Sequence, residues 1–294
     1  MTQQREDSIV TASRQIITIQ DLSAFGGCSL TAVLPILAAM GAQTVPVPTA
    51  LLSAHTGGFG EVVFRDETDF LRRTLAHYTR IGLKPCCVYS GFLGSEDQIG
   101  LTAEYFERFP DALAVVDPVM GDDGKPYRTY TEPMCRRMTE LVRKADVITP
   151  NPTEAALLLG TDYTPEPVTA PQARQMLRGL AALGPRCAVI TGIRIGGEIC
   201  NIGLDAEHEE YRKVPCRYLP VKYPGTGDVF AAVLVGAMTA GEPLPTAMSR
   251  ATGFVEAAVR MTYASGRDPR QGIMVEKCLP QLIGGGDSQR YEVL

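Results

Sequence analysis

Short apolar segments that stop at polar or small residues alternate with amphipathic helical segments along most of this chain. A short, unbroken apolar run is typical of a strand buried on both faces, and such strands occur in parallel sheets. The helical segments between them are the crossovers that parallel strands need. The alternation therefore predicts an α/β fold with three α/β/α layers around a mostly parallel, doubly wound sheet.

The order of these segments favours a single domain. We expect strands at residues 15–19, 44–50, 86–90, 113–116, 146–149 and 187–191, and helices at 29–40, 68–82, 96–109, 171–183 and 244–263. Residues 198–204 and 209–215 alternate polar with apolar side chains, which predicts an antiparallel hairpin. Because no linker divides the chain, we predict one domain over residues 14–283, with a disordered tail at 1–13 and a loose tail at 284–294.

Composition excludes several classes of function. The formal net charge of -5 and the lack of a basic cluster argue against a nucleic-acid surface. No apolar run reaches the roughly 18 residues of a membrane span, and the polar start has no signal-peptide core, so we expect a cytoplasmic protein without membrane contact. The eight cysteines form no C-x-x-C pair and the three histidines lack H-x-x-x-H spacing, so we expect reduced thiols and no zinc chemistry.

A glycine-containing stretch, Pro224 to Asp228, opens directly into an apolar segment of helical length. Glycines at a helix N-terminus leave unpaired backbone N–H groups accessible, and the helix dipole adds positive potential there. We therefore predict an anion site formed by Gly225, Thr226 and Gly227. Asp228 lies inside it, where a carboxylate either stabilises the helix start or, beside a bound phosphate, takes a proton.

Polar residues also follow the predicted strands at the edge where a doubly wound sheet binds its ligands. Carboxylates that converge beside an anion site repel one another unless a cation lies between them. Magnesium fits such a site, because it is held by one or two carboxylates together with water and substrate phosphates. The residues in question are Asp117, Asp122, Asn151, Glu154, Thr191, Gly192 and Asp228.

Three segments come in the order and spacing of one known superfamily. Asp117-Pro118-Val119-Met120-Gly121-Asp122, the segment from Ile148 to Ala155, and Gly225-Thr226-Gly227-Asp228 resemble the ribokinase-like superfamily, and most of all its pyridoxal (vitamin B6) kinase branch. The loops at 48–57 and 90–94 also resemble that branch, so the likeness covers roughly residues 14–283. It implies ATP-dependent phosphorylation of a hydroxymethyl group on a B6 vitamer, in a protein that is commonly a homodimer.

The resemblance also implies a role for each matched residue. Asp228 would be the base that takes the proton of the substrate's 5'-hydroxyl, and Gly225, Thr226 and Gly227 would hold the transferred phosphoryl group. ATP would be bound by Asp117, Asn151, Glu154, Thr191 and Gly192. Mg²⁺ would be held by Asp117, Asp122, Thr149 and Glu154, and the family also allows a monovalent cation. The vitamer would be contacted by Ser23, Thr49, His55 and Phe92. Phe92 stands where many relatives carry tyrosine, and Gln20-Asp21-Leu22-Ser23 replaces a Ser-His start.

Three other interpretations compete with this one. A hydroxymethylpyrimidine kinase of thiamine synthesis shares the fold and the reaction, and none of the motifs separates it from a B6 kinase. A non-catalytic B6-binding protein would have no need of Asp228 at the phosphate site. A dinucleotide-binding oxidoreductase fails because Phe230 stands where the glycine fingerprint needs a third small residue, and a Walker A motif is absent from the sequence.

Overall fold

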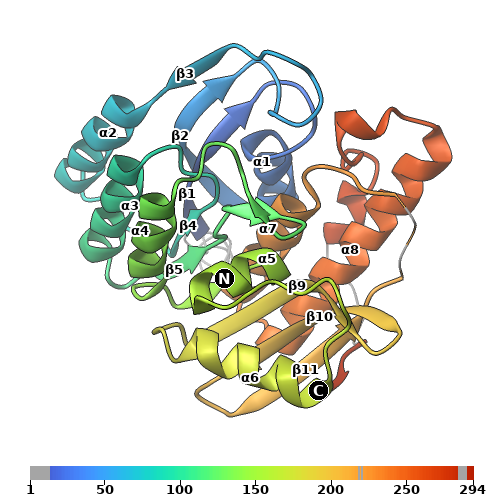
Figure 1. The fold of residues 1–294 in the computed structure, drawn as a ribbon. Helices are drawn as coiled ribbons and strands as arrows, with labels where there is room; N and C mark the ends of the chain where they lie inside the picture. Colours follow the sequence, from blue (N-terminus) through green and yellow to red (C-terminus); the bar gives the residue numbers. More distant parts are fainter. Residues whose placement is uncertain (1–13, 218, 220, 284–289) are drawn as a thin grey trace, which may run out of the picture.

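A ten-stranded sheet organises the part of the chain that the computed structural model describes, residues 14–217, 219, 221–283 and 290–294 (Figure 1). The strand pairs from β2 through β1, β4, β5 and β8 to β9 are parallel, and the outer pairs at both edges are antiparallel. In spatial order the strands are β12 (Glu292–Val293), β11 (Glu210–Pro215), β10 (Glu198–Asp205), β9 (Cys187–Ile195), β8 (Val147–Ile148), β5 (Leu113–Val116), β4 (Cys87–Ser90), β1 (Arg14–Ser23), β2 (Ala42–Leu52) and β3 (Phe64–Asp66).

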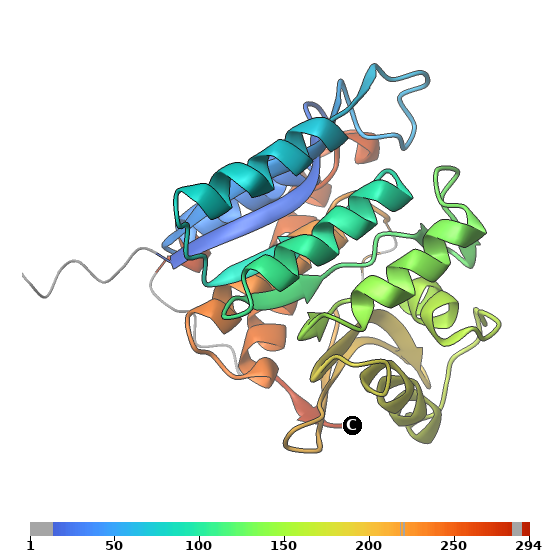
Figure 2. The ribbon, with the colours of Figure 1, turned by 90° about the vertical axis from the view of Figure 1, so that its left-hand side faces the viewer.

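Helices cover both faces of this sheet (Figures 1 and 2). Alternate residues of each central strand enter two separate cores: Val116 and Ile148 face one core, while Val115 and Val147 face the other. The first face carries α2 (Thr68–Arg80), α3 (Glu96–Arg108), α4 (Glu132–Val142), α5 (Pro152–Leu159) and α6 (Ala170–Ala181), and the second carries α1 (Leu30–Ala39), α7 (Thr226–Thr239) and α8 (Leu244–Ser265). The predicted three-layer, mostly parallel fold is confirmed.

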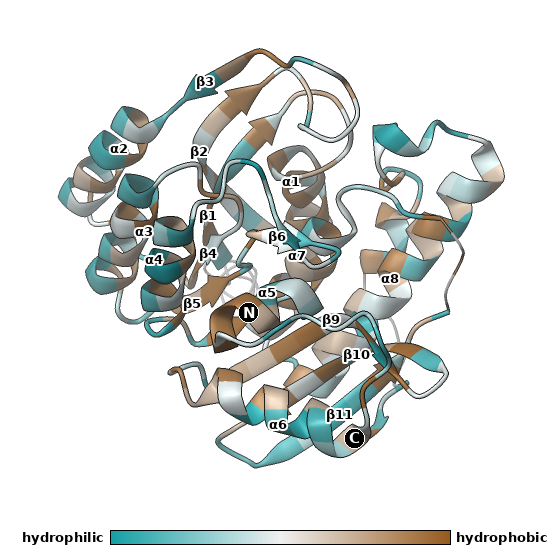
Figure 3. Ribbon diagram, viewed as in Figure 1, coloured by the Kyte–Doolittle hydropathy of each residue, from teal (hydrophilic) through white to brown (hydrophobic). Residues whose placement is uncertain are grey.

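Helix α7 is apolar all round and packs against both α1 and α8. Every residue from Val229 to Ala237 is buried, which is typical of a helix enclosed by its neighbours. Figure 3 shows the same contrast across the molecule, with hydrophobic β5 and β9 at the centre and hydrophilic residues on the outer helix α4. The glycine-containing stretch therefore begins a helix whose position is fixed by the core.

Some elements differ from the prediction. Strand β1 continues through Ser23 instead of ending at residue 19, because Gln20 and Leu22 still pair with β2 despite the polar residues around them. Helices α4 and α5 were not predicted, since each begins in a proline-containing segment that has the composition of a loop. Their starts are set by capping side chains, Thr131 for α4 and Asn151 for α5.

The prediction of a loose tail at 284–294 is wrong for its last residues. Strand β12 pairs with β11 at the edge of the sheet, and the Leu294 side chain is buried. A strand of two residues is too short to give a periodic pattern, so the sequence carries no signal for it. The expected tail at 1–13 and the rest of the C-terminal segment, 284–289, lie outside the described residues.

Two further observations concern the cysteines and the helices. All eight cysteines are free thiols, and Cys28, Cys87, Cys187, Cys200 and Cys278 are buried. Within the described ranges, no helix combines the length and apolarity needed to cross a membrane.

A candidate active site at the carboxyl edge of the sheet

A cavity of about 650 Å³ opens where β5, β8 and β9 end and α7 begins. The parallel strands bring their carboxyl ends to one edge, so side chains far apart in sequence meet there. Residues predicted for the phosphate, ATP and metal sites all line this cavity: Asp117, Asp122, Thr149, Asn151, Glu154, Thr191, Gly192, Gly225, Thr226, Gly227 and Asp228.

The start of α7 forms one wall of the cavity. Gly225 is its N-cap residue, with a positive φ of 85°, and a Cβ at this position would lie 2.7 Å from the carbonyl oxygen of Gly27. Only glycine combines this backbone conformation with such a close approach. The amides of Thr226, Gly227 and Asp228 belong to the first turn, where a helix supplies no acceptor of its own. They are therefore suited to bind an anion.

Asp228 extends from this first turn and is half-buried. Its Oδ2 accepts a hydrogen bond of 2.9 Å from the backbone N–H of Ser29. Burial raises the pKa of Asp228 to about 7; the Ser29 hydrogen bond opposes this shift, and the charges of Asp117 and Asp21 add to it. A carboxylate with a pKa near neutrality can accept a proton from a substrate and release it again.

Two buried acids, Asp117 and Glu154, face the same cavity. The Thr149 hydroxyl donates to Asp117 Oδ1 at 3.0 Å, but burial is the larger effect and raises the pKa of Asp117 to about 7. Burial, and then the charge of Asp117, raise the pKa of Glu154 well above its ordinary value. Each of these buried acids destabilises the ionised form of the other. A cation bound beside them would therefore stabilise both carboxylates.

Asn151 links the start of α5 to the segment that contains Gly121. Its Oδ1 accepts from the Glu154 N–H at 3.0 Å, while Glu154 Oε2 accepts from the Asn151 N–H at 2.8 Å, so the two form a capping box at the start of α5. The Asn151 side-chain amide also donates to the Gly121 carbonyl at 2.8 Å. Gly121 and Asp122 form β6 (Gly121–Asp122), which pairs with β7 (Lys125–Pro126).

The four residues predicted for the metal are arranged unequally. Asp117, Thr149 and Glu154 are buried, whereas Asp122 is exposed on β6. In the described part of the chain, no group of three or more acidic, histidine or cysteine side chains is close enough to hold a metal alone. The arrangement fits an ion such as Mg²⁺, which takes one or two carboxylates and completes its shell with water and substrate phosphates.

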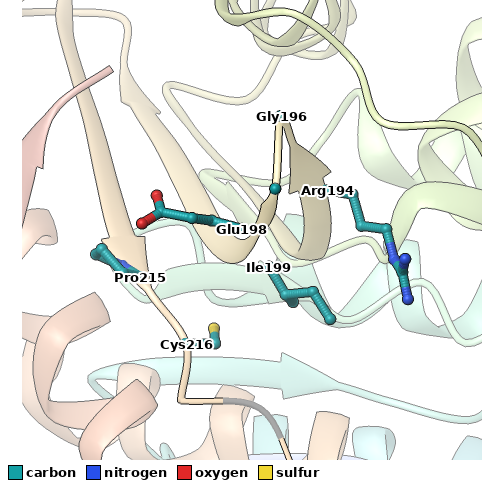
Figure 4. Close-up of a pocket in the computed structure, with 7 residues that line it drawn as sticks. Arg194, Gly196, Glu198, Ile199, Pro215 and Cys216 are labelled. Atoms are coloured by element: carbon teal, nitrogen blue, oxygen red, sulfur yellow. The ribbon is translucent and has the colours of Figure 1, made fainter.

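Residues of β9 form another part of the cavity wall. Gly192 has a positive φ of 67°, and its N–H donates to Asn201 Oδ1 at 2.8 Å. A second hollow of about 370 Å³ lies at the β9–β10 hairpin (Figure 4). Arg194, Ile199 and Cys216 line both hollows, so the two adjoin.

The residues predicted to contact the vitamer do not line the large cavity, and their polar groups are engaged within the protein. The Ser23 hydroxyl donates to Asp21 Oδ2 at 2.6 Å, and the Thr49 hydroxyl donates to the Phe92 carbonyl at 2.9 Å. His55 Nε2 lies 2.6 Å from the Arg270 carbonyl oxygen, and its Nδ1 accepts from the Gly57 N–H at 3.0 Å. His55 therefore connects loops, and contact of these four residues with substrate stays a prediction.

Two residues beside Asp228 were missing from the predicted site. Ser29 contributes its backbone N–H, and its φ of 53° is uncommon for a residue with a side chain. A backbone donor has no sequence signature, so this contact could not be predicted. Asp21 is a buried acid at the end of β1; the polar residues beside it are typical of a loop, so its position in a buried strand could not be predicted.

Comparison with known proteins assigns the chain to a family. Residues 24–272 match the model of the family described as phosphomethylpyrimidine kinase. The chain belongs to the phosphomethylpyrimidine kinase family. It is 30% identical to the curated pyridoxal kinase PdxY of Rubrobacter xylanophilus over 278 residues, which cover 90% of this chain and 93% of that protein.

Solved structures agree with this assignment. A Bacteroides thetaiotaomicron protein, named for the phosphomethylpyrimidine kinase family and crystallised with pyridoxal, is 37% identical with a TM-score of 0.91, covering 96% of this chain and 100% of its own. The pyridoxal kinase of Lactobacillus plantarum is 37% identical with a TM-score of 0.85, covering 92% of this chain and 96% of its own. The predicted ribokinase-like fold is confirmed, and the chain is a kinase of this family.

Proposed function

We propose that this protein transfers the γ-phosphoryl group of ATP to the 5'-hydroxymethyl group of a B6 vitamer. Asp228 accepts the proton of the attacking hydroxyl, and the amides of Gly225, Thr226 and Gly227 hold the transferred group. The observation that carries the proposal is the position of Asp228: a carboxylate with a pKa near 7 in the first turn of a helix whose amides face a cavity. The reacting hydroxyl and the phosphate meet at that point.

The cavity also provides a binding site for the nucleotide in this proposal. Asp117 and Glu154 are suited to hold Mg²⁺, because both are buried acids that line the cavity. The ion would neutralise charge on the ATP phosphates. Thr191 and Gly192 also line the cavity, whose volume of about 650 Å³ leaves room for the rest of the nucleotide.

Hydroxymethylpyrimidine kinase activity is the second candidate, and the description of the matching family favours it. The similarity to a pyridoxal kinase over nine-tenths of both chains, and a relative of 37% identity crystallised with pyridoxal, support the B6 vitamer as the first choice. Both candidates use the same base and the same anion site.

A substrate panel combined with Asp228→Asn tests the proposal. We expect kcat/KM to be highest for one of pyridoxal, pyridoxamine and pyridoxine, lower for hydroxymethylpyrimidine, and lowest for ribose. Asp228→Asn should lower kcat by about 10²–10⁴-fold while ATP binding changes little, since asparagine keeps the size of the side chain but cannot take the proton. Steady-state kinetics and nucleotide titration measure both.

The control is Asp111→Asn, an exposed residue just before β5 and so at the opposite edge of the sheet from the site. It should keep full activity. A higher kcat/KM for the pyrimidine would reverse the choice of substrate. A folded Asp228→Asn enzyme that keeps more than about half of its kcat would exclude the proposed base, and a wild-type protein without kinase activity would leave only a binding role.

A further inference from the structure

An ion pair in the wall of the large cavity joins two segments that are far apart in sequence. Lys222 Nζ lies 2.6 Å from Asp123 Oδ1 and 2.5 Å from Asp123 Oδ2, and both residues line the cavity. Their side chains are 69% and 71% exposed. An ion pair as exposed as this one contributes little free energy, because water screens it. A ligand that carries more negative charge can therefore take the place of Asp123.

The two partners differ in their freedom to move. Asp123 and Gly124 are the two turn residues between β6 and β7, and both have positive φ, of 51° and 76°. Positive φ at both positions is typical of a type I′ turn, which fixes a tight hairpin. The Gly124 N–H also donates to Thr153 Oγ1 at 2.9 Å, so the hairpin is held against α5. Lys222 ends in a flexible four-carbon chain and is the partner that can move.

Lys222 belongs to the segment that leads into the proposed phosphate site. It stands three residues before Gly225, the N-cap residue of α7. The carbonyl of the next residue, Tyr223, accepts from the Thr226 hydroxyl at 3.4 Å, so this segment lies against the first turn of the helix. A long side chain on this segment, in the wall of the same cavity, can reach a phosphate group bound by the first-turn amides.

The charge around the cavity makes a cation useful at this point. Acidic side chains outnumber basic ones along its wall, and among the residues that the structure describes the basic ones are Arg194, Arg217 and Lys222. Arg194 lies on β9 and Arg217 just beyond β11, whereas Lys222 shortly precedes α7. ATP carries more negative charge than one Mg²⁺ neutralises, and the transfer of a phosphoryl group requires that charge to be compensated.

We propose that Lys222 is a nucleotide-binding residue that exchanges partners: it pairs with Asp123 in the free protein and with the terminal phosphate groups of ATP in the complex. Asp123 then competes with ATP for the same ammonium group and weakens nucleotide binding. The proposal rests on the proposed kinase function and adds a residue that distinguishes nucleotides by the length of their phosphate chain.

An exchange of partners predicts opposite effects for the two residues. Lys222→Met keeps the length of the side chain but removes its charge, so it should weaken ATP binding by about tenfold or more. Lys222→Arg keeps the charge and should retain most of the affinity. Asp123→Asn should tighten ATP binding by about two- to fivefold, because Lys222 no longer leaves an ion pair, and asparagine suits the type I′ turn. A purely structural ion pair would make both losses of charge act in the same direction.

Titration calorimetry with Mg²⁺ and ATP, ADP or adenosine measures these effects on wild type, the single variants and Lys222→Met/Asp123→Asn. The loss in Lys222→Met should be greatest for ATP, smaller for ADP and absent for adenosine. Asp123→Asn should have almost no effect in the Lys222→Met background, whereas a general decrease in negative charge would still tighten binding there. Lys125→Met is the matched control, because Lys125 is exposed on β7 and does not line the cavity. It should bind ATP like wild type.

Three results would overturn the assignment of Lys222: equal losses for ATP and adenosine, weaker ATP binding in Asp123→Asn, or a gain in Asp123→Asn that persists without Lys222. The titration needs no phosphate acceptor, so it is independent of the B6 substrate. A protein that binds ATP but phosphorylates no B6 vitamer would refute the proposed function alone. A wild-type protein that binds no ATP would refute both.

Discussion

At the scale of single residues, the site brings together several acids whose ionised forms would be more stable in water than in the protein. Burial raises the pKa of Asp21, Asp117, Glu154 and Asp228 alike. Each ionised acid in such a place costs folding free energy, and a bound cation or substrate offsets that cost. These four acids therefore reduce the stability of the free protein at neutral pH.

Asp228 gives this cost a measurable pH dependence. Its pKa is near 3.8 when unfolded and about 7 when folded, so from pH 4 to 7 the folded state keeps a proton that the unfolded state releases. The contribution of Asp228 to stability is complete below pH 4 and is lost as the pH rises through 7. In Asp228→Asn the melting temperature relative to wild type should be unchanged near pH 4 and a few degrees higher at pH 8.

Scanning calorimetry across this range, without nucleotide or divalent metal, measures the difference. Asp111→Asn, which replaces an exposed acid, should show no such trend. A melting-temperature difference for Asp228→Asn that does not grow between pH 4 and pH 8 would contradict the burial of the charge.

At the scale of elements, the first turn of α7 shows how two glycines in one motif differ in purpose. Gly225 needs its positive φ and its close approach to Gly27, whereas a Cβ on Gly227 would have no atom of another segment within 4 Å, and Gly227 lies in a helical turn. The first glycine is required by the fold, and under the proposed function the second leaves space for an anion. The sequence motif shows both glycines but does not separate these roles.

Replacing each glycine by alanine should separate them. Gly225→Ala should lower stability by about 1–3 kcal/mol, because alanine is strained at this φ and its Cβ meets the Gly27 carbonyl. Gly227→Ala should keep or slightly raise stability, since alanine favours a helix, yet lower kcat by roughly tenfold or more by obstructing the anion site. Urea unfolding and kinetics on both variants decide; equal losses of stability would refute the distinction.

At the scale of the whole molecule, the sequence predicted the sheet and the polar residues that gather at its carboxyl edge, because both follow from local patterns. Asp117 directly follows a buried strand, and Asn151 and Asp228 belong to helix starts with recognisable capping or glycine signals. Contacts between distant segments could not be predicted in this way. Ser29 and Asp228 are 199 residues apart in sequence, and their hydrogen bond depends on how α1 packs against α7.

The segment that contains Arg290 is a second case of long-range assembly, and it contacts the wall of the large cavity. Arg290 donates to Glu256 Oε2 at 3.0 Å, and its N–H donates to Ser249 at 2.9 Å. Glu256 is 8% exposed on α8, and its Oε1 accepts from the Arg217 N–H at 2.7 Å. Both Glu256 and Arg217 line the large cavity. Arg290 therefore compensates a buried acid in the cavity wall.

Removing Arg290 alone should be costly. Breaking a fully buried ion pair costs about 3–5 kcal/mol, and because the Arg290 side chain is 33% exposed we expect Arg290→Ala to lose about 1–3 kcal/mol. The double variant Glu256→Gln/Arg290→Ala should recover much of this loss, since no charge then stays buried without a partner. Urea unfolding of wild type, both single variants and the double variant gives the coupling free energy. Additive losses would mean that β12 is held by its ladder with β11 and by Leu294, and that Arg290 does not support the cavity wall.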